Sequence, residues 1–157
     1  MSPMWTLYRH IAALTVMFER DADPIRREFE SLVDEMDLRE VVRKPFVQMS
    51  RGQLYKSALI SMKLMDCPIW LLDEPFASGM DSHGTRVMKQ WFRAAAESGK
   101  TIIFTTQLPE IAVFADRVVL LQRQKAQFFR TSGRDVLDGD GRCFDLEEMM
   151  EESRCGN

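Results

Sequence analysis

The chain has 157 residues, of which 45% are hydrophobic, so it is long and apolar enough to bury the core of one globular domain. Its net charge of −3, without a basic block, argues against nucleic acid as a main partner. Its three cysteines lack metal-ligand spacing and predict no disulfide framework. No apolar segment has the length of a membrane span and the start does not resemble a signal peptide, so direct membrane insertion is not expected.

The first 48 residues predict helices without strands. Apolar residues at helical spacing predict a helix over residues 5–20, with an inward face of Leu7, Ile11, Leu14 and Phe18. Asp23 as an N-cap, followed by Pro24, predicts the start of a second helix. Its expected apolar face consists of Ile25, Phe29, Leu32, Val33 and Met36. With a shorter helix expected at 38–43, residues 1–48 are predicted to form a small helical lobe.

From Ser50 onward, helices alternate with strands, which predicts an α/β fold with a mostly parallel sheet. The apolar run at 69–72 does not alternate with polar residues, as is typical of a strand buried on both faces. The other expected elements are helices at 50–65, 82–97, 109–114 and 145–152, and strands at 101–105, 117–121 and 126–130, the last at a sheet edge. Residues 49–131 are therefore predicted to form the α/β core and residues 132–157 a C-terminal tail with an acidic helix.

The segment Ser50-Arg51-Gly52-Gln53 stands where a helix begins. Ser-x-x-Gln is the pattern of a capping box, in which the two side chains satisfy amides of the first turn. The same helix start, with a glycine in it, also offers amide donors and a partial positive charge to a phosphate. The residues alone leave both interpretations open.

Two carboxylates, Asp73 and Glu74, follow the apolar strand at its carboxyl end, where parallel sheets bind ligands. The alternative is a pair that meets solvent or caps the next turn. The segment from Ser78 to Asp81 is predicted to be a turn into the next helix, with Asp81 as its N-cap.

In this order, the three motifs resemble the signature loop, the Walker B strand and the D-loop in the second half of ABC transporter ATP-binding subunits. The resemblance covers nearly all of residues 5–131 and implies a partial, P-loop NTPase-like ABC ATPase fold. It implies ATP and Mg²⁺ as cofactors, Asp73 as a Mg²⁺ ligand and Glu74 as the general base. It also implies that Ser50, Arg51, Gly52, Gln53 and Asp81 contact nucleotide, the signature loop doing so on the opposing subunit.

The sequence departs from the family at two places that matter for catalysis. It contains no Gly-x-x-x-x-Gly-Lys-Ser/Thr P-loop, because the one Gly-Lys-Thr, at 99–101, has Ala94 in the first glycine's place and runs from helix to strand. Where the family has a switch histidine, this chain has Gln107 or Thr106, depending on the alignment. A glutamine there can hydrogen-bond a phosphate but carries no positive charge, so hydrolysis is expected to be impaired.

The resemblance implies a partial subunit that couples ATP hydrolysis to transport through a membrane-spanning permease, at the cytoplasmic face of the membrane. A second ATP-binding subunit or P-loop-bearing chain would complete the site, and the absent strands predict an exposed apolar edge. One alternative is an inactive ABC-like module that docks on a permease or a full ATPase subunit. Another is the C-terminal lobe of an SMC-like DNA-associated ATPase, which the short capped helices of residues 5–45 disfavour because such lobes follow long coiled coils.

Overall fold

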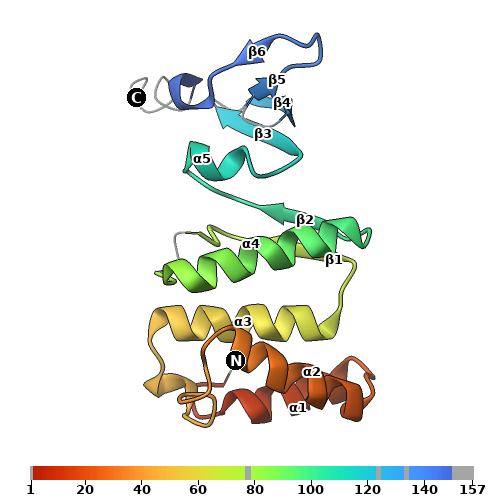
Figure 1. The fold of residues 1–157 in the computed structure, drawn as a ribbon, viewed down its shortest axis with the longest axis vertical. Helices are drawn as coiled ribbons and strands as arrows, with labels where there is room; N and C mark the ends of the chain where they lie inside the picture. The colour runs from red at the N-terminus through yellow and green to blue at the C-terminus, as the bar shows by residue number, and fades with distance from the viewer. Residues whose placement is uncertain (1, 77–78, 123–124, 133–134, 150–157) are drawn as a thin grey trace. The chain divides into compact units, whose positions relative to one another are not determined.

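The structure is a computed structural model that describes residues 2–76, 79–122, 125–132 and 135–149 (Figure 1). The chain forms two compact units, Met1–Thr105 and Thr106–Asn157. Within the described residues, no helix combines the length and the apolar character needed to cross a bilayer.

The first unit begins with two helices, α1 (Leu7–Met17) and α2 (Ala22–Glu35). The expected apolar face of α2 is buried throughout. The predicted N-cap Asp23 is wrong, because the side chain of Asp21 accepts the Asp23 amide at 3.1 Å and starts the helix earlier. Pro24 then falls in the first turn, where a missing amide proton loses no helical hydrogen bond. Helix α1 ends sooner than predicted and leaves Phe18 43% exposed.

The predicted helix at 38–43 is also wrong. This segment forms turns in which the Leu38 carbonyl accepts bonds from the amides of Val41 and Val42. A short 3₁₀ helix, Phe46–Gln48, follows Pro45 instead. Few residues are available before the proline, and a helix that short gains too few hydrogen bonds to offset the entropy of its first turn.

The α/β part of the first unit consists of α3 (Arg51–Met65), β1 (Ile69–Leu72), α4 (Ser82–Glu97) and β2 (Thr101–Phe104). These elements confirm the predicted ones to within one residue at each end. Strands β1 and β2 are parallel and pair in register from Ile69↔Thr101 to Leu72↔Phe104. Helix α4 packs on one face of this pair (Figure 1), where Trp70 and Phe92 make an edge contact with ring centroids 6.2 Å apart.

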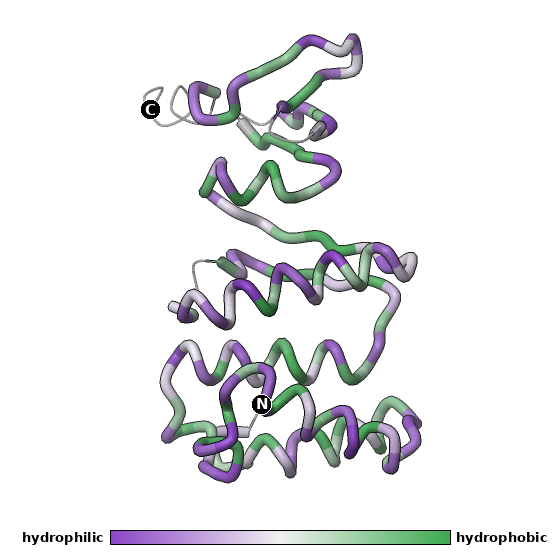
Figure 2. The backbone as a smooth tube through the Cα atoms, viewed as in Figure 1, coloured by the Kyte–Doolittle hydropathy of each residue, from purple (hydrophilic) through white to green (hydrophobic). Residues whose placement is uncertain are grey.

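No described element covers the opposite face of the β1–β2 pair. Its apolar members Ile69, Leu71 and Ile103, here called the open sheet face, are 60%, 77% and 51% exposed, and the exposed Thr101 lies beside Ile69. The prediction that the strand at 69–72 is buried on both faces is therefore wrong for this chain. Both strands are hydrophobic along their length (Figure 2), yet only one face receives a helix from the described residues.

The second unit contains a small antiparallel sheet, preceded by a short helix. Its elements are α5 (Pro109–Ala112), β3 (Arg117–Gln122), β4 (Lys125–Ser132), β5 (Asp135–Leu137) and β6 (Cys143–Phe144). The strand order is β3-β4-β5-β6, so β4 lies between two strands and not at the predicted edge. The buried core comprises Ala112, Phe129, Val136 and Leu146.

Of the predicted acidic helix at 145–152, residues 146–149 are helical and the remainder lies outside the described residues. The division into segments 1–48, 49–131 and 132–157 followed the motifs. This division stays a prediction, and the two compact units of the structure divide the chain at a different place, after Thr105.

Candidate functional site

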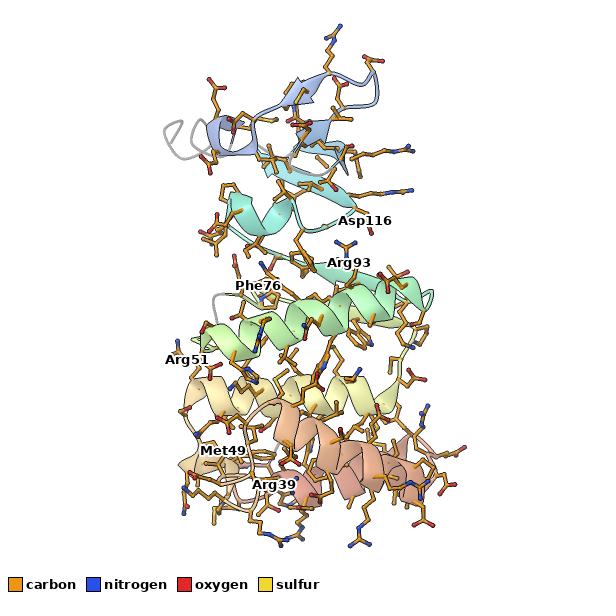
Figure 3. The ribbon with its side chains drawn as sticks, in the orientation of Figure 1. Arg39, Met49, Arg51, Phe76, Arg93 and Asp116 are labelled. Carbon is orange, nitrogen blue, oxygen red and sulfur yellow. The ribbon has the colours of Figure 1, made fainter. Side chains whose placement is uncertain are left out.

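The start of α3 is a complete capping box. The Ser50 amide donates to Gln53 Oε1 at 2.9 Å, and the Gln53 amide donates to Ser50 Oγ at 3.2 Å. The amides of Arg51 and Gly52 take no part in this box. They and the positive end of the helix dipole are the features that suit an anion. The exposed Arg51 side chain lies at the same helix end (Figure 3).

Gly52 is required by close packing against the turn that precedes α4. A Cβ atom at this position would lie 2.9 Å from the Gly79 carbonyl oxygen, closer than real Cβ contacts occur. The sequence connected Gly52 with phosphate binding and did not indicate this backbone approach. Any side chain here would push the start of α3 away from the turn.

An ion pair connects α3 to the start of α4. Lys56 Nζ donates to Asp81 Oδ2 at 2.7 Å, and the Lys56 side chain is only 6% exposed. Asp81 Oδ1 accepts the Gly84 amide at 2.6 Å as the N-cap of α4. The Lys56 bond, and then the Gly84 amide, hold the pKa of Asp81 below its usual range. Both carboxylate oxygens are thus engaged in the fold, and a nucleotide contact by Asp81 stays a prediction.

We expect Asp81→Asn to destabilise the first unit, because asparagine keeps the cap but leaves the buried Lys56 ammonium unpaired. Since Asp81 is largely exposed, we expect a loss of about 2 kcal/mol rather than the full penalty of a buried pair. The melting temperature should fall by roughly 4–8 °C. Thermal denaturation at pH 7 measures this, and equal midpoints for Asp81→Asn and wild type would contradict it.

The same ion pair gives the stability a defined pH dependence. Because the folded pKa of Asp81 is lowered, the contribution is complete above the unfolded value of about 4 and disappears as the pH falls through the folded value. The difference between Asp81→Asn and wild type should therefore vanish in acid. As a control, Lys56→Met combined with Asp81→Asn removes both charges and should recover part of the loss.

Asp73 and Glu74 lie together at the carboxyl end of β1, where Thr105 from the end of β2 holds them. Thr105 Oγ1 donates to Asp73 Oδ1 at 2.6 Å and accepts the Glu74 amide at 2.9 Å. Glu74 has a φ of 44°, in the left-handed region that non-glycine residues adopt only at a cost. The strand ends therefore hold the Asp73 carboxylate and the Glu74 backbone in one turn.

Asp73 suits Mg²⁺ only together with a nucleotide. Among the residues that the structure describes, no group of three or more His, Cys, Asp or Glu side chains could hold a metal. Mg²⁺ is commonly bound by one or two carboxylates, with waters and substrate phosphates completing its octahedron. The exposed carboxylate of Asp73 at a strand end fits that arrangement and does not form a metal site of its own.

Sequence reasoning missed two residues beside these carboxylates. Thr105 was counted only as the end of a strand, although a polar side chain at the carboxyl end of the neighbouring parallel strand was the signal that would have found it. Tyr55, on α3, has a buried hydroxyl without a hydrogen-bond partner in the described part of the chain. Burial, and then the charge of Asp73, raise the pKa of Tyr55 to about 12, so the phenol stays protonated.

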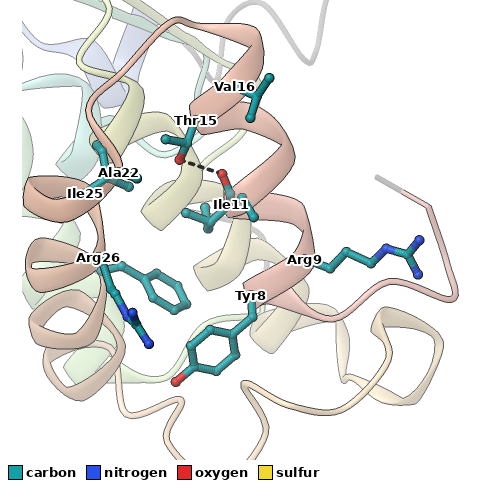
Figure 4. Close-up of a pocket in the computed structure, with 10 residues that line it drawn as sticks. Tyr8, Arg9, Ile11, Thr15, Val16, Ala22, Ile25 and Arg26 are labelled. Atoms are coloured by element: carbon teal, nitrogen blue, oxygen red, sulfur yellow. Dashed lines mark hydrogen bonds between the residues drawn. The ribbon is translucent and has the colours of Figure 1, made fainter.

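Two further features concern other parts of the chain. Gln107 belongs to the second unit, so its predicted catalytic role stays a prediction. In the helical lobe, a groove of about 560 Å³ runs between α1 and α2 (Figure 4). Its lining contains Arg9, Arg26 and apolar side chains but no acid, and the Thr15 hydroxyl in it donates to the Ile11 carbonyl at 2.8 Å. The groove is thus not a metal site.

The relatives found by comparison with known proteins include ATP-binding subunits of ABC transporters, and no family model matches the chain. It is 31% identical over 119 residues to the sulfate/thiosulfate import ATP-binding protein of Mesorhizobium japonicum, covering 74% of this chain and 34% of that protein. A solved ATP-binding subunit of an ABC transporter has the same fold, with a TM-score of 0.76 and 17% identity over 97% of this chain and 57% of that one. A second solved structure, a dimeric ATP-binding cassette with bound ADP and phosphate, has a TM-score of 0.67 and 19% sequence identity. The match covers 83% of this chain and 59% of that one. The chain spans less than half the length of the curated relatives it matches.

Proposed function

We propose that this chain, a homologue of the ATP-binding subunits of ABC transporters with the ABC ATPase fold, is one part of a composite ATPase. In this proposal, the chain contributes the signature loop, the Mg²⁺-binding carboxylate and the general base. Another polypeptide contributes the P-loop, which is absent from these 157 residues.

The open sheet face is the observation that supports a partner most strongly. Parallel sheets are covered on both faces in folded proteins, whereas the β1–β2 pair is covered on one. The most exposed member of the uncovered face, Leu71, is 77% exposed although it lies in the middle of an apolar strand. The solved ATP-binding subunit also extends well beyond the region that this chain covers. We therefore propose that the P-loop-bearing polypeptide packs on the open sheet face.

The proposed roles follow the positions of the side chains. Asp73 would hold Mg²⁺, which when bound with ATP neutralises charge on the phosphates. Glu74 would take the proton of the attacking water, and the bond from its backbone amide to Thr105 would hold it in position. The start of α3, with the amides of Arg51 and Gly52 and the Arg51 guanidinium, would contact the γ-phosphate held by the opposing subunit.

We further propose a membrane-spanning permease and a second ATP-binding subunit as partners, at the cytoplasmic face of the cell membrane. The relative from Mesorhizobium japonicum is named for import of sulfate and thiosulfate, and one structural neighbour is a dimer. These names support a transport role for this chain. The neutral Gln107, which lacks the charge of a switch histidine, favours the alternative of an inactive docking module with the same partners.

Calorimetric titration with Mg²⁺-ATP tests the proposal. The purified chain alone is expected to show no binding. Its complex with a co-purified chain that contains Gly-x-x-x-x-Gly-Lys-Ser/Thr is expected to bind saturably, and Asp73→Asn is expected to weaken that binding. Saturable binding by the chain alone that is lost in Asp73→Asn would overturn the composite site. A complex that binds nucleotide without turnover would select the docking module.

A further inference from the structure

We propose that Thr105 is a positioning residue that orients the Asp73 carboxylate and holds the backbone of Glu74. This inference deepens the proposed function and rests on it for its catalytic consequence only. A threonine hydroxyl has one proton and can also accept hydrogen bonds. In this structure its proton goes to Asp73 Oδ1 at 2.6 Å and it accepts the Glu74 amide at 2.9 Å. One side chain therefore connects the two residues that the site needs in fixed positions.

The bond to Asp73 selects one orientation of an exposed carboxylate. With Oδ1 engaged by the hydroxyl, the other oxygen is the one left to face a cation. Partners behind a metal ligand generally fix its rotamer, and removing them commonly lowers metal affinity or activity 10–100-fold. Thr105 has the position and the proton for this role.

The bond to Glu74 acts on the backbone. A non-glycine residue with a φ of 44° persists only where its surroundings hold it there. The Thr105 hydroxyl accepts a hydrogen bond from the amide of Glu74. It therefore stabilises the left-handed backbone conformation from which the Glu74 side chain extends.

The strand pairing itself does not need this hydroxyl. The Thr105 amide donates to the Leu72 carbonyl at 3.1 Å, a bond that any residue other than proline would make. Valine has the shape of threonine without the hydroxyl, and serine has the hydroxyl without the methyl group. Comparing the two variants separates positioning of the carboxylates from packing of the strand end.

Backbone NMR and amide hydrogen exchange on the purified chain decide the inference. In Thr105→Val, we expect the Glu74 amide to lose its protection and the Glu74 Cα shift to move away from the left-handed value, while Thr105→Ser keeps both. The amide of Thr105 itself should remain protected in both variants. Unchanged protection and shift of Glu74 in Thr105→Val would overturn the inference.

The catalytic consequence is measured on the complex with the P-loop-bearing chain. Thr105→Val should lower kcat/KM for Mg²⁺-ATP about 10–100-fold, through the affinity as well as the rate because Asp73 is the assigned metal ligand, and Thr105→Ser should restore most of it. A wild-type rate in Thr105→Val would overturn the positioning role. A wild-type complex without turnover would instead count against the proposed function, and the exchange measurement would still decide the inference on Thr105.

Discussion

Replacing Glu74 by glutamine is expected to lower ATP hydrolysis by the complex with the P-loop-bearing chain by about 10²–10⁴-fold. Glutamine keeps the shape of the side chain but cannot take a proton from water. The backbone amide that donates to Thr105 is unchanged by the substitution, so the turn should keep its conformation. Affinity for Mg²⁺-ATP should therefore stay at the wild-type value, since the loss falls on the chemical step.

Two comparisons make this prediction specific. Glu97→Gln, at the exposed end of α4, makes the same chemical change away from the carboxylates and should leave the rate unchanged. Asp73→Asn should lower Mg²⁺-ATP affinity as well as the rate, because Asp73 is assigned to the metal. Steady-state ATPase rates and calorimetry on the same preparations measure both quantities. Wild-type turnover in Glu74→Gln would remove Glu74 from the role of general base.

Replacing Leu71 by aspartate is expected to weaken association with the P-loop-bearing chain by at least about 10²-fold. Leu71 is 77% exposed in this chain, so the charge costs the isolated fold little. In the complex, the substitution loses roughly 1.5–3 kcal/mol of leucine burial and adds the desolvation of an unpaired carboxylate. The same charge should reduce self-association of the isolated chain, because it interrupts the open sheet face.

Leu121 offers a matched control, because it is also 77% exposed and also lies in a strand, but in the second unit. Leu121→Asp should leave the affinity for the P-loop-bearing chain unchanged. Analytical ultracentrifugation or calorimetry of the two variants gives the comparison. If Leu121→Asp were the variant that lost binding, the docking surface would lie on the second unit and the assignment to the open sheet face would be refuted.

Much of the fold follows from local signals in the sequence. The four elements of the α/β part were predicted because their apolar spacing, caps and turn residues agree with one another. The errors come where local signals compete. Asp21 and Asp23 are both acceptable N-caps, and the one that starts the helix is the earlier. The short strands β5 and β6 carry too few residues for a recognisable alternation.

The candidate site was predictable as far as it depends on the order of motifs. Asp73, Glu74 and the start of α3 were selected as candidates in that way. The contacts within the site depend on segments that are distant in the sequence. Thr105 reaches Asp73 only because β1 and β2 are neighbours in register, and Lys56 reaches Asp81 only because α3 packs on the start of α4. A linear pattern contains neither pairing.

The open sheet face also has a consequence for the amount of this protein in a cell. In the proposed composite ATPase the open sheet face is covered only in the complex, so the unbound chain is exposed to aggregation and to quality control. Binding to the P-loop-bearing chain lowers the concentration of the unbound chain by mass action. We therefore expect its steady-state abundance to follow the supply of the P-loop-bearing chain, so that the two accumulate in fixed stoichiometry whatever their separate rates of synthesis.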